Sequence, residues 1–196
     1  MLLNRSFYLR ENVVAIAREL LGKYIVTTFD GVLTSGMITE TEAYAGISDK
    51  ASHAFGGRST ARTEVMYRQG GTAYVYLCYG IHSLFNIVTN GQGTPHAILI
   101  RAFRPMQGLN MMERRLGRKA GNKSFTSGPG NVAKALGIHY TVSGADLCGG
   151  ANRQENSIWV EDRGILPADD EVLITPRIGV AYAGQDAILP YRFLLK

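Results

Sequence analysis

Residues 71–103, GTAYVYLCYGIHSLFNIVTNGQGTPHAILIRAF, contain three runs that are typical of β-strands. The run TAYVYLCY is rich in β-forming residues, and Tyr79-Gly80 interrupts it before SLFNIVT resumes. The sequence NGQG then predicts a second turn ahead of HAILIRAF. Because these connections are short, we expect the strands to pair antiparallel.

The segments on either side add further strands. KYIVTTF (residues 23–29) and GVLTSGMITETEAY (residues 31–44) predict two strands around a turn at residues 29–31. Short strands are also expected within residues 165–180 and in the final PYRFLLK. Strands therefore dominate the predicted secondary structure.

Three segments have helical patterns. Apolar side chains recur with helical spacing in residues 12–21, and Asn12 can cap the start of this helix. Residues 105–119 look helical after Pro105, and residues 127–138 predict another helix that opens with the turn SGPG. An antiparallel sheet with a few helices places the chain in the α+β class.

The composition is that of one soluble domain. The chain has 196 residues, of which 45% are hydrophobic and 19% charged, so we expect a single domain over residues 1–196 with a hydrophobic core. Charges recur through residues 1–23, which lack the apolar core of a signal peptide, and no apolar run approaches the roughly 20 residues that span a bilayer. We therefore expect a cytoplasmic protein without a membrane partner.

The cysteines and histidines do not predict a metal site. Cys78 and Cys148 lie far apart without a CxxC pattern, so neither a disulfide framework nor a zinc ribbon is expected. His82, His96 and His139 lack the spacing of metal ligands. The phosphate-loop pattern GxxxxGK[ST] is also missing. We predict neither a metal nor a cofactor.

Positive charge is concentrated in residues 101–123. This segment holds seven basic residues, Arg104 among them, and one acidic residue, so its net charge of +6 exceeds the +5 of the whole chain. A solvated helix face is one explanation. With Arg58, Arg62 and Arg68 elsewhere, we favour a strip that contacts the phosphates of a duplex without reading sequence.

A second stretch, ITETEAYAGISDKASHAFGGRSTAR (residues 38–62), contains candidate catalytic residues. On a strand, Glu40, Glu42 and Tyr44 share one face. A glutamate that is partly desolvated near aromatic rings becomes a better base for water. The spacing does not choose between the two acids, and a solvated strand face is the alternative explanation.

Aromatic side chains form a second candidate feature. Tyr74 and Tyr76 share a strand face, and ordinary core packing would explain either one alone. Together with Tyr44 and His53, they could hold a planar heterocycle between rings, with about 1–3 kcal/mol for each stacked base.

These motifs, taken in order, resemble the alkyladenine (3-methyladenine) DNA glycosylase family. The resemblance runs from about Phe7 to Phe193 and rests on ETEAY at 40–44, His53, GGR at 56–58, YVYLCYG at 74–80, Asn86, LIRA at 99–102 and SGPG at 127–130. It implies one domain with a curved antiparallel sheet, a protruding β-hairpin and surrounding helices. It also implies a monofunctional repair enzyme that flips a damaged purine out of duplex DNA and hydrolyses its N-glycosidic bond.

The resemblance assigns the catalytic residues. Glu42 matches the general base that activates water, which leaves Glu40 with a supporting or surface role. Arg101 matches an arginine that helps to hold the water, and Ile178 falls where a main-chain carbonyl also holds it. No lysine stands at the matching nucleophile position, so we expect an abasic product without strand cutting.

The resemblance also assigns the binding residues. Tyr44 and Tyr76 match the rings that sandwich the flipped base. His53 matches a residue that contacts the base or the DNA backbone, and Asn86 matches one that filters the exocyclic groups of purines. Tyr79 matches the residue wedged into the duplex, and Ile81 stands at a second intercalating position.

Two other functions compete with this one. A non-catalytic nucleic-acid-binding module would use the same basic residues and aromatic rings. A sugar hydrolase could use Glu40 and Glu42, which lie about 7 Å apart along a strand, but the basic charge and the single tryptophan, Trp159, argue against it. We expect a monomer whose partner is double-stranded DNA containing damaged purines.

Overall fold

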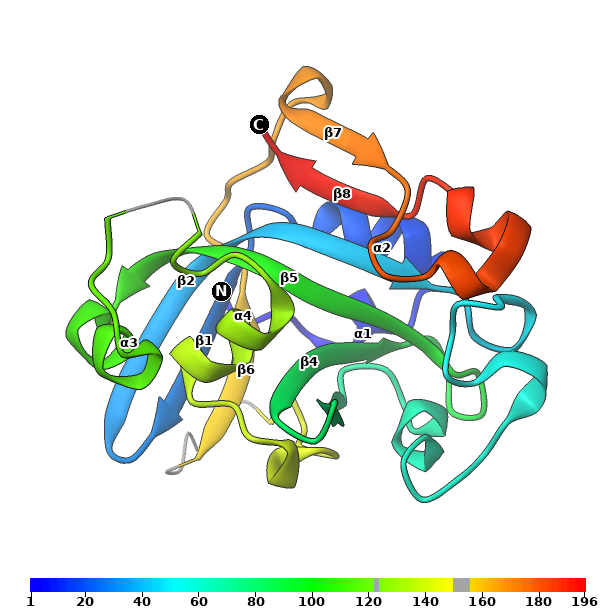
Figure 1. Ribbon diagram of the computed structural model, residues 1–196, viewed down its shortest axis with the longest axis horizontal. Coiled ribbons are helices and arrows are strands. Elements are labelled where there is room, and N and C mark those ends of the chain that lie inside the picture. Colours follow the sequence, from blue (N-terminus) through cyan, green and yellow to red (C-terminus); the bar gives the residue numbers. More distant parts are fainter. Residues whose placement is uncertain (122–123, 150–155) are drawn as a thin grey trace.

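The computed structural model describes residues 1–121, 124–149 and 156–196. Its centre is an antiparallel sheet with the order β3-β4-β5-β2-β1-β6, to which β8 and β7 are added beside β2 (Figure 1). The strands are β1 (Tyr24–Phe29), β2 (Val32–Tyr44), β3 (Ala73–Cys78), β4 (His82–Thr89), β5 (His96–Gln107), β6 (Ser157–Glu161), β7 (Val172–Thr175) and β8 (Arg192–Leu195). The predicted α+β class with an antiparallel sheet is confirmed.

Helices and short 3₁₀ turns surround this sheet. The α-helices are α1 (Arg5–Tyr8), α2 (Val13–Glu19), α3 (Leu109–Leu116) and α4 (Pro129–Leu136). The 3₁₀ segments are η1 (Gly46–Ser48), η2 (Phe55–Gly57), η3 (Glu64–Tyr67), η4 (Tyr140–Val142), η5 (Asp169–Glu171) and η6 (Ala181–Ile188). The helix α2 packs on β2 and β5, while α4 packs on β4 and β5. Their apolar side chains join the strands in one buried core. None of the helices in the described ranges is both long and apolar enough to cross a membrane.

Most of the predicted elements are present, with three differences. The helix α2 is capped as expected, since the side chain of Asn12 accepts a hydrogen bond from the backbone N–H of Ala15 at 3.0 Å. The helix predicted from Pro105 begins only at Leu109, because β5 continues to Gln107 and pairs with β2. The strand β6 and the short helix α1 were not predicted.

The pairing of β2 with β5 has three irregularities, one between Ser35 and Gly36 and two beside Glu40. In the pairing of β2 with β5, Ile38 faces Phe103 and Glu40 faces Ala102, so Thr39 is an extra residue on β2. The next pair is Thr41 with Ile100, so Arg101 is an extra residue on β5. Such β-bulges re-aim side chains and often lie next to active sites.

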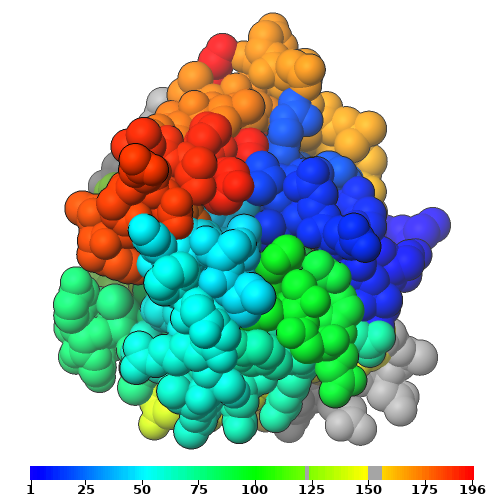
Figure 2. Space-filling model, turned by 90° about the vertical axis from the view of Figure 1, so that its right-hand side faces the viewer, coloured from blue at the N-terminus to red at the C-terminus, as the bar shows by residue number. Residues whose placement is uncertain are grey.

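The strands β3 and β4 form the expected hairpin. Its turn has two consecutive residues with positive φ, Tyr79 (52°) and Gly80 (73°). A bulky residue rarely adopts this conformation, which costs it about 1–2 kcal/mol. The side chains of Tyr79 and Ile81 are 91% and 72% exposed. In Figure 2 this blue-green tip stands out from the left edge of the molecule.

Candidate active site

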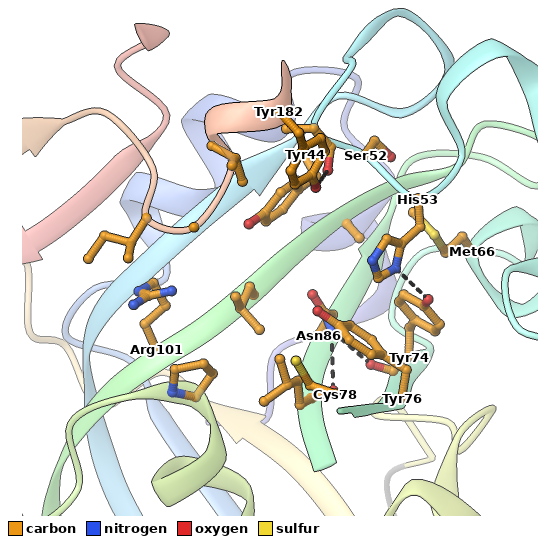
Figure 3. Close-up of a pocket in the computed structure, with 18 of the residues that line it drawn as sticks. Tyr44, Ser52, His53, Met66, Tyr74, Tyr76, Cys78, Asn86, Arg101 and Tyr182 are labelled. Carbon is orange, nitrogen blue, oxygen red and sulfur yellow. Dashed lines mark hydrogen bonds between the residues drawn. The ribbon is translucent and has the colours of Figure 1, made fainter. Parts of the chain in front are cut away.

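A cavity of about 200 Å³ opens where the C-terminal half of β2, the β3–β4 hairpin, β5 and the loop after β7 meet. Figure 3 shows Tyr44 on one side of it and Tyr74 with Tyr76 on the other. Pockets for drug-sized ligands measure about 300–1,000 Å³. The smaller volume suits a single planar ring system between aromatic walls.

Glu42 lies directly behind the wall of this cavity. It is fully buried, and its Oε2 accepts a hydrogen bond from the Tyr44 hydroxyl at 2.8 Å. Its Oε1 accepts one from the backbone N–H of Ile178 at 2.8 Å, and the Nε of Arg101 lies 3.4 Å from the same oxygen. Tyr44, Arg101 and Ile178 themselves line the cavity, so they cover the carboxylate and fix its position.

Glu40 is also buried, so the alternative of a solvated strand face is wrong. Its Oε1 accepts hydrogen bonds from the Nε of Arg101 at 2.9 Å and from the Nε of Arg192 at 2.6 Å. The bulge at Arg101 thus places one cation beside both acids. Glu40 has the supporting position, because it holds the arginine that adjoins Glu42.

Tyr44 rests on an ion pair that sequence reasoning missed. The Arg177 guanidinium lies 4.8 Å from the centroid of the Tyr44 ring and binds both carboxylate oxygens of Asp49, at 2.5 and 2.9 Å. Both side chains are almost fully buried, at 0% and 2% exposure. Arg177 also donates to the carbonyl oxygen of Ala43 and directly precedes Ile178. The ion pair therefore supports Tyr44 and Ile178, the two residues that donate hydrogen bonds to Glu42.

Burial and the negative charge of Glu42 raise the pKa of the Tyr44 hydroxyl well above its usual value. The hydroxyl consequently stays protonated at physiological pH and remains a donor to the Glu42 carboxylate.

The opposite wall is a cluster of three rings. The Nδ1 of His53 lies 2.9 Å from the Tyr74 hydroxyl, and the rings of Tyr74 and Tyr76 are 5.4 Å apart between centroids. Burial, followed by the charges of Arg62 and Arg58, lowers the pKa of His53 to about 4. The imidazole is therefore neutral at physiological pH, and it meets Tyr76 edge-on at 4.7 Å.

Asn86 is held rigidly at the base of this wall. It is buried on β4, and its amide nitrogen donates to the carbonyl oxygens of Tyr74 at 3.2 Å and Leu84 at 3.3 Å. Figure 3 shows its side chain beside Tyr76 at the cavity. The orientation of its amide is thus fixed before any ligand enters.

The predicted DNA-contacting residues lie at the surface, but Arg104 borders a separate hollow between β2, β5 and β8. Tyr79 lines the cavity near the hairpin tip, and Arg58, Arg62 and Arg104 are exposed. Within the basic segment 101–123, other cations have protein partners: Arg101 (Glu40), Arg115 (the carbonyl of Ala135), Arg118 (the carbonyls of Ser124 and Phe125) and Lys119 (Glu113). Lys123 lies outside the described residues. Phosphate contact by this segment stays a prediction, for which Arg104 and Arg114 are the exposed candidates.

Within residues 1–121, 124–149 and 156–196, no group of three or more His, Cys, Asp or Glu is arranged to hold a metal ion.

Comparison with known proteins identifies the family of the chain. The chain matches the family model described as Methylpurine-DNA glycosylase (MPG) over residues 6–196. Curated relatives with the name "Putative 3-methyladenine DNA glycosylase" include a protein of Chlamydia felis, 43% identical over 99% of this chain and 96% of the relative. Proteins of Desulfitobacterium hafniense and Clostridium botulinum with the same name are 40% and 39% identical, over 99% and 100% of this chain and 95% and 96% of the relatives. The chain therefore belongs to the methylpurine-DNA glycosylase family.

Proposed function

We propose that this protein is a monofunctional DNA glycosylase. It flips alkylated or deaminated purines out of duplex DNA and hydrolyses the N-glycosidic bond with water activated by Glu42, which leaves an abasic site. The observation that carries this proposal is the fully buried Glu42 carboxylate, fixed by two 2.8 Å hydrogen bonds behind a tyrosine-lined cavity.

Glu42 keeps the capacity to accept a proton. An ionised carboxylate offers about four lone-pair sites, and the two close hydrogen bonds from Tyr44 and Ile178 leave others open. Because Tyr44, Arg101 and Ile178 cover the carboxylate, one of them must move aside before water from the cavity can donate to Glu42 and attack C1′ of the extruded nucleotide. The negative charge also stabilises the oxocarbenium-like sugar that forms as the base leaves.

Tyr44 and Tyr76 supply the surfaces that hold the extruded base. They lie on opposite sides of the cavity (Figure 3). Alkylation at N3 or N7 makes a purine cationic, and the electron-rich faces of the rings attract such a base. The neutral imidazole of His53 and the fixed amide of Asn86 contact the base or the DNA backbone from the same wall.

Tyr79 stabilises the extruded state. Extrusion costs a few kcal/mol, and an apolar wedge in the vacated space offsets part of that cost. An exposed tyrosine at a narrow hairpin tip, followed by the exposed Ile81, is shaped for insertion. The net charge of +5 favours DNA as the partner. We also propose that the protein acts in the cytoplasm as a monomer and without a cofactor.

The test is single-turnover excision from duplexes that contain one hypoxanthine or one 7-methylguanine. Glu42→Gln keeps the shape of the side chain and removes its charge, so excision should fall by about 10²–10⁴-fold while binding to lesion DNA persists. Glu40→Gln is the matched change at the neighbouring acid, and its loss should be much smaller.

Three results would contradict the proposal. Excision by Glu42→Gln at the wild-type rate would remove Glu42 from the mechanism. A larger loss of excision rate in Glu40→Gln than in Glu42→Gln would show that Glu40 is the base and Glu42 the supporting acid. Binding of DNA by the wild-type protein without release of either base would support a non-catalytic nucleic-acid-binding module instead.

A further inference from the structure

The Tyr76 ring already carries a cation. The guanidinium of Arg62 lies 4.6 Å from the centroid of this ring. Tyr76 lines the cavity and Arg62 does not, so the guanidinium contacts a ring of the cavity wall without being part of the wall itself. Arg62 belongs to the exposed loop between η2 and η3, within the cyan surface at the centre of Figure 2.

The charge of Arg62 is not cancelled by a neighbouring acid. In the described part of the chain, no carboxylate lies within 4.0 Å of it. Tyr44, on the other side of the cavity, also has a guanidinium on its ring, that of Arg177, but Asp49 neutralises this cation. The two walls therefore differ: the Tyr44 side is backed by a neutral ion pair and the Tyr76 side by a net positive charge.

An uncancelled cation changes what the ring can bind. The face of an aromatic ring attracts cations through its quadrupole. When a guanidinium already interacts with the ring, a second cation that binds beside the ring is repelled by the first, whereas a neutral base suffers no such repulsion.

We propose that Arg62 is a specificity-determining residue that shifts the preference of the pocket from cationic alkylated purines toward neutral purines. This inference rests on the function proposed above and adds to it a residue that adjusts the ranking of lesions. Burial is the main cause of the lowered pKa of His53, and the charges of Arg62 and then Arg58 follow, so the positive charge of this loop reaches the same wall of the cavity.

The experiment compares Arg62→Gln with Arg58→Gln. Both variants remove one exposed positive charge from the same loop, but the structure places only the Arg62 guanidinium over a ring of the cavity. Single-turnover excision is measured at saturating enzyme on duplexes with 7-methylguanine, which is cationic, and with hypoxanthine, which is neutral. The quantity of interest is the ratio of the two rates.

We expect Arg62→Gln to raise the ratio of 7-methylguanine to hypoxanthine excision about two- to fivefold, the factor that about 0.5–1 kcal/mol of cation–π energy represents. Arg58→Gln should change the ratio less than Arg62→Gln does, because its guanidinium is not over the Tyr76 ring and its charge ranks below that of Arg62 among the causes of the lowered pKa of His53. An unchanged ratio in Arg62→Gln, or an equal change in both variants, would overturn the inference. If Arg62 serves only as a phosphate contact, its loss weakens binding of both duplexes and the ratio at saturation stays constant.

The proposed function and the role of Arg62 are refuted by different results. A wild-type protein that excises neither base refutes the proposed function and this inference with it. A wild-type protein that excises both bases, with an unchanged ratio in Arg62→Gln, refutes only the role of Arg62.

Discussion

Replacing Asp49 by alanine tests how far the buried ion pair supports the site. In the folded protein, Asp49 binds Arg177 through both oxygens, at 2.5 and 2.9 Å, with side-chain exposures of 2% and 0%. It also accepts hydrogen bonds from the backbone N–H groups of Ala45 at 2.9 Å and Ala51 at 3.0 Å. Asp49→Ala leaves a buried guanidinium without its counter-ion and two N–H groups without their acceptor.

The expected loss of stability is large. Removing one partner of a buried pair costs about 3–5 kcal/mol, because the remaining charge stays desolvated. For 196 residues, the unfolding entropy at about 2.1 cal/mol/K per residue amounts to about 0.4 kcal/mol/K. The melting temperature should therefore fall by about 7–12 °C.

The chain provides a matched control at its surface. Arg10 and Glu19 form a pair with the same two-bond geometry, at 2.9 and 2.8 Å, but each side chain is 42% exposed. Exposed pairs contribute about 0–1 kcal/mol, so Glu19→Ala should lower the melting temperature by about 2 °C at most. The two ion pairs share one geometry but differ in burial, and Asp49 additionally binds the backbone N–H groups of Ala45 and Ala51, so the larger cost of Asp49→Ala reflects both differences.

The assay is thermal and urea unfolding of the wild-type protein and both variants in one buffer. Near-equal shifts for Asp49→Ala and Glu19→Ala would refute the argument from burial. Arg177 stacks on Tyr44 and precedes Ile178. The excision rate of Asp49→Ala should therefore be lower than that of the wild-type protein even at temperatures well below the melting temperature of the variant. Undiminished excision there would show that the pair does not position Glu42.

Three other predictions concern the hairpin, the histidine and the surface. Tyr79→Gly removes a side chain held at positive φ, so it should stabilise the fold by about 1 kcal/mol in urea unfolding while excision falls. The pKa of His53 is lowered from 6.5 to about 4, so between these values the unfolded chain binds a proton that the folded chain does not bind. The free energy of unfolding should therefore fall as the pH drops through this interval. His53→Gln should lack that component of the pH dependence in chemical unfolding. Arg58→Ala and Arg104→Ala should each reduce the slope of log K against log salt for DNA binding by about 0.9, and an unchanged slope would exclude the phosphate contact.

The sheet could be predicted from the sequence where the local pattern and the final pairing agree. The runs that became β1 to β5 are rich in β-forming residues and are separated by recognisable turns. The end of β5 and the strand β6 depend instead on pairing with distant partners. Pro105 to Gln107 continue a strand because β2 lies beside them, and Ser157–Glu161 pairs with β1. Neither partner is visible in a local window of sequence.

The site was predictable in its residue types but not in its burial. The alternation predicted that Glu40, Glu42 and Tyr44 share one side of a strand; in the structure Tyr44 donates to Glu42, and Arg101 lies beside both acids. Whether that side is exposed depends on Ile178 and Arg192, which lie 136 and 152 residues further along the chain than the acids they contact. Asp49 and Arg177 were missed for the same reason, since 128 residues separate them.

The paired bulges of β2 and β5 set a reshaped segment inside the ladder. Because the extra residues Thr39 and Arg101 lie on opposite strands, the offset between paired residues from Thr41 onward equals the offset between Gly36 and Ile38. An extra residue has no partner across the ladder, so deleting Thr39 or Arg101 would leave the neighbouring pairs in place and would remove the local bend instead. Deleting Arg101 would also remove the cation that adjoins both Glu40 and Glu42.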